Sequence, residues 1–403
     1  MLYQELKKKY SLCNYCFDRQ LAGVRKYYDR SKNISSTTTT TTGNNNPNNS
    51  CDICHGIMSQ LDSITEKICC AVEGGKYEFN SFLLGGTLPS ATFDREDSIR
   101  AQFKIRGREN VKKQFINELR RKFKKITGKK VEHIIPDIII NVVIDDQGST
   151  TYQPITISVR SSPLFLTGRY VKRRRGLSQK KDKCQKCSGI GCVSCGHVGA
   201  SSLNSVEAII ASRMLEITRG ENPKFSWLGG EDKYSLVLGK GRPFLLSLSN
   251  PKSRSLKGGD LKIEENGVCA VIRQQAKSQL PSRLPAHFIT KTRITIQTED
   301  DLSNSKNLGA LLLGALENSE VTFKSKSKIV RKKIYSLKVR QVDKNKFVLT
   351  INADGGLLIK QFVEGQEYFE PNISNIIGTK CKCTGFDILD VKTQSDFWDD
   401  CPN

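Results

Sequence analysis

Two groups of paired cysteines constrain this sequence more than any other feature. In the first group two CxxC pairs are far apart, and in the second both pairs fall within CQKCSGIGCVSC. Two such pairs supply the four thiolates of a tetrahedral zinc site, because each tight turn points both of its sulfurs at one ion. The sequence therefore predicts one or two structural zinc ions, with the ligands Cys13, Cys16, Cys51 and Cys54 in the first group and Cys184, Cys187, Cys192 and Cys195 in the second.

These sites are expected to be structural rather than catalytic. A catalytic zinc keeps an open position and usually has His, Asp or Glu ligands, but the chain has only four His and no HExxH pattern. His55 and His197 lie beside the groups and are alternative ligands, although the spacing favours four sulfurs. Ordinary free or buried thiols are the other interpretation. The N-terminal MLYQELKKKYSL lacks the apolar core of a signal peptide, so we expect the nucleus, the cytoplasm or both. In such a reducing compartment, paired cysteines indicate metal rather than disulfides.

The charge of the chain points to a polyanionic partner. Lys and Arg number 64 against 41 Asp and Glu, which gives a formal net charge of +23. An excess of this size attracts nucleic acid, while the simpler reading is a basic, solvated surface. No apolar stretch approaches the roughly 18 residues of a membrane span, so no membrane partner is expected.

The order of segments predicts an α+β protein in several parts. Residues 31–50 are almost entirely polar, which predicts a disordered insert within the first cysteine group. Apolar residues four apart between Val111 and Phe123 predict a basic amphipathic helix that ends at Gly128, and two β-branched runs after it predict paired strands. The predicted parts are a zinc-binding unit at 1–80, a basic α/β module at 81–168, a basic linker with the second cysteine group at 169–200, and a mixed α/β domain at 201–403.

Three stretches of the chain resemble one family. They are RSSPLFLTGRYVKRRR at 160–175, GGEDKYSLVLGKGRPFLLSLSNP at 229–251 and GGLLIKQFVEGQEYFEPNI at 355–373. Together they resemble the tRNA pseudouridine synthase 10 family of archaea and eukaryotes. The resemblance implies a zinc-containing N-terminal unit, a THUMP-like RNA-binding module and a C-terminal pseudouridine synthase domain, in the order derived above.

The resemblance also implies an activity. Members isomerise uridine to pseudouridine in the T loop of tRNA, which makes tRNA the expected partner and requires no catalytic cofactor. The sequence is consistent with this, since it has neither GxGxxG nor a P-loop motif. We infer no obligate protein partner.

Two catalytic residues follow from the family motifs. The GRED turn that carries the family's catalytic aspartate reads Gly229-Gly230-Glu231-Asp232 here, which assigns that role to Asp232. The GTYIKEF motif reads GLLIKQF and keeps its basic residue as Lys360. The chemistry needs an ionised carboxylate, as nucleophile or base, beside a cation that keeps it charged. The alternative is an ordinary turn acid and a lysine on a strand.

Other positions depart from the family motifs. Gly230 replaces the arginine of GRED, Tyr234 and Leu236 replace residues of EDVDVR, and Leu358 replaces the tyrosine of GTYIK. The family's stacking tyrosine aligns with Arg293, whose flat guanidinium can also stack on a base. These changes leave open a catalytically degenerate RNA-binding protein or RNA chaperone on the same fold.

Two further classes of protein are disfavoured. A zinc-knuckle protein chaperone of the DnaJ type would carry an HPD tripeptide, which is missing from the sequence. A zinc-finger DNA-binding factor would open a recognition helix beside its cysteines.

Clustered basic residues, with one tyrosine among them, are the candidate RNA contacts, because phosphates attract cations and exposed bases stack on flat side chains. The predicted contacts are Arg169, Tyr170, Lys172, Arg173, Arg174, Arg175, Arg242, Arg293, Arg331, Lys332 and Lys333.

Overall fold

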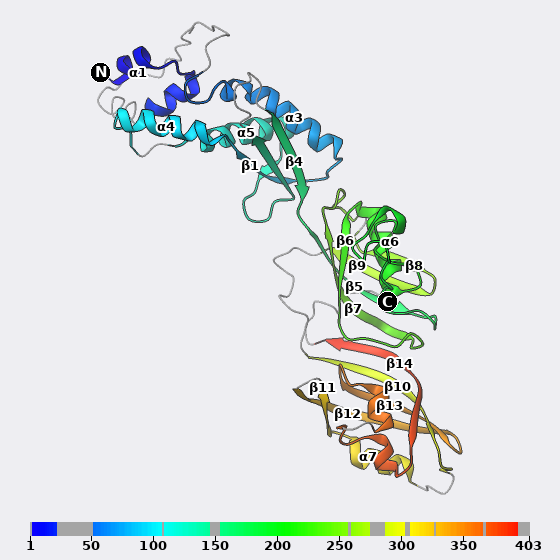
Figure 1. Cartoon of the computed structure of the whole chain (residues 1–403). Helices are drawn as coiled ribbons and strands as arrows, with labels where there is room; N and C mark the ends of the chain where they lie inside the picture. The colour runs from blue at the N-terminus through cyan, green and yellow to red at the C-terminus, as the bar shows by residue number, and fades with distance from the viewer. Residues whose placement is uncertain are drawn as a thin grey trace. The chain divides into compact units, whose positions relative to one another are not determined.

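The computed structural model divides the chain into two compact units, Met1–Ser162 and Pro163–Asn403 (Figure 1). It describes residues 2–21, 51–106, 109–145, 154–256, 259–274, 287–302, 307–325, 328–365 and 368–393. The predicted disordered insert at 31–50 lies outside these residues. No helix within the described ranges is long and apolar enough to cross a membrane.

The first unit packs helices against a small sheet. Its elements are α1 (Leu2–Lys9), η1 (Ile57–Gln60), α3 (Leu61–Gly74), β1 (Ser81–Thr87), α4 (Ser90–Gln102), α5 (Val111–Thr127), β2 (Lys130–Val131), β3 (Ile138–Ile144) and β4 (Ile155–Ser161). The strand order is β2-β1-β3-β4, with β1 parallel to both of its neighbours and β4 antiparallel to β3. This confirms the predicted pairing of the two β-branched runs.

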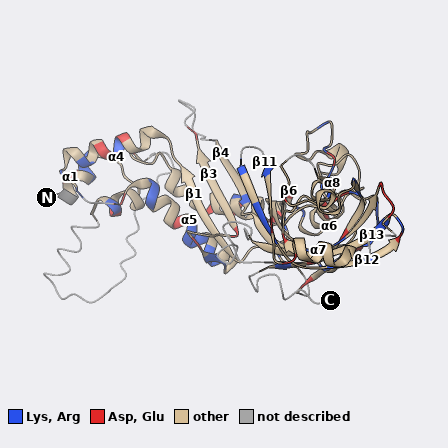
Figure 2. Ribbon diagram, turned by 90° about the horizontal axis from the view of Figure 1, so that it is seen from below, with Lys and Arg blue, Asp and Glu red and all other residues tan. Residues whose placement is uncertain are grey.

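Helix α5 matches the predicted amphipathic helix. The Asn110 side chain accepts a hydrogen bond from the backbone N–H of Lys113 at 2.9 Å, and Gly128 ends the helix with a φ of 68°. Val111, Phe115, Leu119 and Phe123 are all buried. Lys and Arg follow the outer face of this helix (Figure 2).

One continuous core fills the first unit. It runs from Leu6 through Cys16, Cys51 and Cys54 to Ile144. The cysteine-containing segment and the α/β module therefore share their packing, and the predicted division near residue 80 does not separate two cores.

The second unit is built on one long sheet. Its elements are β5 (Leu164–Lys172), η2 (Val193–Cys195), α6 (Val206–Thr218), β6 (Glu221–Trp227), β7 (Val237–Ser249), β8 (Leu261–Glu265), β9 (Val268–Gln274), β10 (Phe288–Thr298), α7 (Leu308–Leu316), β11 (Glu320–Ser325), β12 (Lys328–Asp343), β13 (Lys346–Asp354), α8 (Ile359–Glu364), α9 (Ile373–Ile377) and β14 (Cys381–Thr393). The order is β11-β12-β13-β10-β14-β7-β5-β9-β8, and β6 also pairs with β7.

Strands β14 and β7 lie at the centre of this sheet and run parallel. They pair only at Ile388 and Val237, and we refer to this short pairing as the joint between β14 and β7. A core around β5, β7, β9 and α6 lies on one side of this joint, and a core around β10, β12, β13 and the C-terminal helices lies on the other.

The predicted boundary between 168 and 169 falls inside β5. This strand pairs along its length with β7 and β9, so it belongs to the second unit. The first residues of the predicted linker, Arg169 to Lys172, are accordingly strand residues. The finer division of the chain into four parts stays a prediction.

Replacing Phe115 by Ala tests the packing of α5. Phe115 is fully buried, so we expect the apparent free energy of unfolding of the first unit to fall by about 3–5 kcal/mol. Ile126 lies on the same helix and is 62% exposed, so Ile126→Ala should change this free energy by less than about 0.5 kcal/mol. Urea unfolding followed by circular dichroism measures both, and equal effects would contradict the packing described.

Candidate active site

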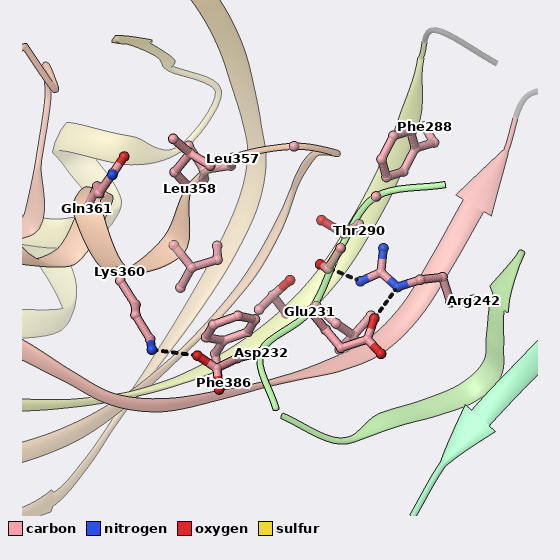
Figure 3. Close-up of a pocket in the computed structure, with 16 residues that line it drawn as sticks. Glu231, Asp232, Arg242, Phe288, Thr290, Leu357, Leu358, Lys360, Gln361 and Phe386 are labelled. Atoms are coloured by element: carbon pink, nitrogen blue, oxygen red, sulfur yellow. Dashed lines mark hydrogen bonds and ion pairs between the residues drawn. The ribbon is translucent and has the colours of Figure 1, made fainter. Parts of the chain in front are cut away.

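A pocket of about 440 Å³ opens beside the joint between β14 and β7 (Figure 3). Its lining comes from the turn between β6 and β7, from strands β7, β10 and β14, and from α8 with the turn that leads into it. The lining residues are Gly229, Gly230, Glu231, Asp232, Arg242, Phe288, Thr290, Thr292, Gly356, Leu357, Leu358, Ile359, Lys360, Gln361, Phe386 and Ile388.

Asp232 and Lys360 meet in this pocket although they are far apart in the chain. Lys360 Nζ lies 2.5 Å from Asp232 Oδ2, and Asp232 Oδ1 accepts a hydrogen bond from the backbone N–H of Tyr234 at 3.0 Å (Figure 3). The Lys360 hydrogen bond, followed by that of Tyr234, lowers the pKa of Asp232. The same contact raises the pKa of Lys360. Both groups are therefore charged at neutral pH, and Lys360 lies in α8 rather than on a strand.

Glu231 points the other way, into the protein. Its side chain is fully buried and lies 3.0 Å from Arg242 Nε and 3.6 Å from Lys172 Nζ. The Tyr170 hydroxyl donates to both carboxylate oxygens at 2.7 Å. Burial, and then the charge of Glu231, raise the pKa of Tyr170 well above its usual value, whereas burial lowers the pKa of Lys172. We refer to Tyr170, Lys172, Glu231 and Arg242 as the buried quartet.

The two cations of the buried quartet hold the backbone of the turn. Arg242 donates to the carbonyl oxygens of Leu228 at 2.7 Å and Gly230 at 3.1 Å. Lys172 Nζ donates to the carbonyl oxygen of Asp232 at 3.1 Å. Three carbonyl oxygens of one short turn are thus held by buried cations. These contacts fix the backbone of the turn, and with it the direction in which the Asp232 side chain points.

Phe288 packs against both this turn and the turn that leads into α8, the helix that contains Lys360. A Cβ atom on Gly355 would lie 2.0 Å from the Phe288 ring, and one on Gly229 would lie 3.1 Å from the ring and 2.5 Å from Arg242 Nη1. Gly229 also has a φ of 79°. The Gly355 N–H donates to the Phe288 carbonyl at 2.7 Å. Only glycines allow this approach, which brings the Asp232 turn and the start of α8 against the same ring.

Four of the predicted RNA contacts are buried, so the prediction is wrong for these residues. Arg169, Tyr170, Lys172 and Arg242 are at most 3% exposed, and each of them forms hydrogen bonds to protein atoms. Arg169 Nη1, for example, donates to the carbonyl oxygens of Gly241 and Val391. Side chains held in this way do not reach a phosphate, and three of these residues form the buried quartet with Glu231.

Arg293 is not in the position expected for a stacking residue. It is absent from the described residues that line the pocket, and its guanidinium bonds to Asp387 instead. The aromatic rings in the pocket lining are Phe288 and Phe386. Leu358 and Gly230, which replace family residues, do line the pocket.

The remaining predicted contacts are accessible. Arg173, Arg174, Arg331 and Lys333 are exposed, Arg175 is half-exposed, and Lys332 lies over Gly356 at the edge of the pocket. Two residues of importance were missed, Glu231 as the centre of the buried quartet and Asp387 as the partner of Arg293. A signal for the quartet was present, since Arg242 is the one charged residue of the run RPFLLSLS, which is otherwise mostly apolar.

In both cysteine groups the four sulfurs are close enough together to hold a metal ion. In each, the four Sγ atoms lie within 4.8 Å of one another, and neither His55 nor His197 belongs to these sets. In the second cluster, backbone N–H groups of Gly191, Cys192 and Gly199 donate to cysteine sulfurs at 3.2–3.3 Å. Although burial opposes the shift, the backbone donors Cys192 and Gly199 lower the pKa of Cys195 to about 6. Four cysteine sulfurs gathered this closely fit the ligand set of a tetrahedral metal ion.

Comparison with known proteins places these features in a family. The family model described as Pus10, C-terminal, matches residues 165–392, and the model described as Pus10 THUMP domain, archaeal, matches residues 64–145. The protein named tRNA pseudouridine synthase Pus10 of Nitrosopumilus maritimus is 31% identical over 396 residues, 97% of each chain. The protein of the same name from Methanocaldococcus jannaschii is 30% identical over 361 residues, 85% of this chain and 75% of the relative.

Replacing Glu231 by Ala tests the buried quartet. The change leaves two buried cations without their carboxylate, so we expect the second unit to lose about 3–5 kcal/mol of stability. Glu299 is a matched control, because it forms a loose, exposed pair with Lys380, and Glu299→Ala should cost at most about 1 kcal/mol. Urea unfolding measures both changes. An effect of Glu231→Ala no larger than that of the control would contradict the role assigned to the quartet.

Proposed function

Because the chain belongs to the Pus10 family of tRNA pseudouridine synthases, we propose that it is an isomerase that converts uridine to pseudouridine in the T loop of tRNA, with Asp232 as its catalytic carboxylate. The observation that carries this proposal is the ion pair of Asp232 with Lys360 in a pocket that also presents Leu, Ile and Phe side chains. The family motifs support the T loop as the site of modification.

The reaction is a rearrangement within one nucleotide. The bond between ribose C1′ and uracil N1 breaks, the base turns while it is held, and C1′ joins uracil C5. The proton leaves C5 and N1 gains one, so no electrons and no outside group are consumed. For this reason the proposal requires no catalytic cofactor.

Asp232 is suited to act on the ribose. Lys360 and the Tyr234 N–H each occupy one side of its carboxylate and keep it ionised, and each oxygen retains a further lone pair. Such a carboxylate can attack C1′ as a nucleophile or remove a proton as a base. For a uracil that has left its stack, Leu357, Leu358 and Ile388 offer apolar contacts, and the rings of Phe288 and Phe386 offer flat surfaces.

We further propose that both cysteine clusters hold structural zinc. Four thiolates leave no open position for a water or a substrate, which suits a structural ion. Three sulfurs of the first cluster are buried in the core that they share with α5 and the sheet of the first unit. Metal binding there would contribute directly to the folding of the module that matches the THUMP model.

A degenerate RNA-binding protein remains the second candidate. It is favoured by one observation, that the described lining of the pocket contains no tyrosine. It shares the fold, the zinc sites and the expected tRNA binding with the enzyme, so that only turnover separates the two.

Mapping of pseudouridine by carbodiimide labelling and primer extension tests the activity. We expect the parent protein to produce a stop in the T loop of an unmodified tRNA transcript, and Asp232→Asn, at equal tRNA occupancy, to produce none. No stop with the parent despite tight tRNA binding would overturn the enzyme and leave the second candidate.

The pH dependence of turnover tests the ion pair. Lys360 lowers the pKa of Asp232, so in Lys360→Met this pKa rises and the carboxylate is protonated at a higher pH. The acid limb of the kcat profile should therefore move to higher pH, with the largest loss near the acid end of a range from about pH 4 to pH 8. Lys338→Met, at an exposed position of β12, is the control and should leave the profile unchanged. A uniform loss at all pH values would contradict this role of Lys360.

Metal analysis of the purified protein tests the clusters. We expect about two equivalents of zinc in the parent protein and about one in either Cys16→Ser or Cys187→Ser, because each replaces one of four ligands. Cys70→Ser, at an exposed cysteine outside both clusters, should retain the full content. Less than about one equivalent in the parent would remove both zinc sites from the account.

A further inference from the structure

A second charged centre lies next to the pocket, on the side of β14 that faces away from it. Phe386 and Ile388 line the pocket, so Asp387 between them points away from it, because successive residues of a strand alternate. Asp387 is only 6% exposed, and it accepts hydrogen bonds from Arg175 Nη1 at 2.8 Å and Nη2 at 3.0 Å. Arg293, directly opposite on β10, donates to Asp387 Oδ2 at 3.0 Å.

This carboxylate holds both arginines in fixed positions. Burial opposes ionisation of Asp387, but the hydrogen bonds of Arg175, of the Leu236 N–H and of Arg293 outweigh it and lower its pKa. One negative charge then faces two positive ones. The group carries a net positive charge, and its geometry is set before any ligand binds.

Both arginines also reach solvent. The side chains of Arg175 and Arg293 are 49% and 44% exposed, so each offers surface that a ligand can reach. Along β10 the exposed residues are Lys291, Arg293 and Gln297, which alternate with the buried Thr292, Ile294 and Ile296. The face that carries Arg293 is thus open, and a guanidinium fork held in place suits a phosphate group.

An exposed aromatic residue adjoins the two arginines. Tyr234 is 64% exposed, and its carbonyl oxygen accepts a hydrogen bond from Arg175. Its N–H donates to Asp232, and Lys233 Nζ lies 6.0 Å from the centre of its ring. A ring in this position can stack on an unpaired base.

We propose that Arg175, Arg293 and Tyr234 form a binding site for the RNA strand beside the target uridine, in which the arginines hold phosphates and Tyr234 stacks on a neighbouring base. This inference rests on the proposed function for the identity of the RNA. Residues 232 and 234 are at most about 7 Å apart along the chain, so a nucleotide next to the one at Asp232 is within reach of the Tyr234 ring. Because the Tyr234 N–H also holds the Asp232 carboxylate, strand binding here acts on the orientation of that carboxylate.

The test measures binding of an unmodified tRNA transcript by full-length protein over a range of salt concentrations. All variants carry Asp232→Asn, so that the RNA is not altered during the measurement. We expect the double variant Arg175→Ala, Arg293→Ala to bind at least tenfold more weakly and to lower the slope of log K against log salt by about one to two. Arg213→Ala is the matched control, since Arg213 is also a half-exposed arginine with a carboxylate partner, Glu216.

Substitutions at Tyr234 test the stacking separately. Tyr234→Ala should weaken tRNA binding about tenfold with little change in the salt slope, and Tyr234→Phe should bind like the parent. The melting temperature of each variant shows whether it folds. A purely structural role of the Asp387 group would lower this temperature and leave the salt slope unchanged, which would overturn the proposal.

Two further outcomes are decisive. If polyglutamate competes for the site as well as tRNA does, and the arginine variants weaken both equally, the surface binds acidic chains in general and the RNA proposal is wrong. Failure of the proposed function is a different result, because the salt-slope loss would persist while the carbodiimide assay showed no pseudouridine. If the parent protein forms pseudouridine and both sets of variants bind tRNA as the parent does, the strand-binding site is wrong while the proposed function stands.

Discussion

The buried carboxylate of Glu231 is the interaction on which the rest of the site depends. A lone carboxylate inside a protein costs several kcal/mol, and here Arg242, Lys172 and the Tyr170 hydroxyl offset that cost. The same two cations bind carbonyl oxygens of the turn that contains Glu231. The turn is therefore rigid, and the next residue, Asp232, is presented on its other side.

Three acidic side chains near this turn have different surroundings and different consequences. Glu231 is fully enclosed by cations and serves the fold. Asp387 is nearly buried, and its two arginines reach solvent. Asp232 has a single lysine and one backbone N–H, in a pocket open to a nucleotide, so its charge is kept while its oxygens remain accessible. The three carboxylates differ in how completely they are surrounded. This difference separates the structural role of Glu231 from the RNA contact that we propose beside Asp387 and the catalysis that we propose for Asp232.

Local patterns in the sequence predicted local structure well. The spacing of apolar residues identified α5, and the CxxC pairs identified two clusters whose sulfurs do lie together. Family motifs selected Asp232 and Lys360, which the fold brings within 2.5 Å. Long-range features were not predictable in this way. The basic run at 169–175 resembles a surface cluster, but its first residues lie in a central strand, where Arg169, Tyr170 and Lys172 are buried. The direction of Arg293 depends on its register with Asp387, and Asp387 itself lies in no recognisable motif.

Release of tritium from tRNA labelled with [5-³H]uridine is the most direct measurement of the central claim, since joining C1′ to C5 must expel the hydrogen on C5. We expect release by the parent protein up to a fixed number of uridines per tRNA, and none by Asp232→Asn bound to the same RNA. No release by a folded parent that binds tRNA, or equal release by Asp232→Asn, would contradict it.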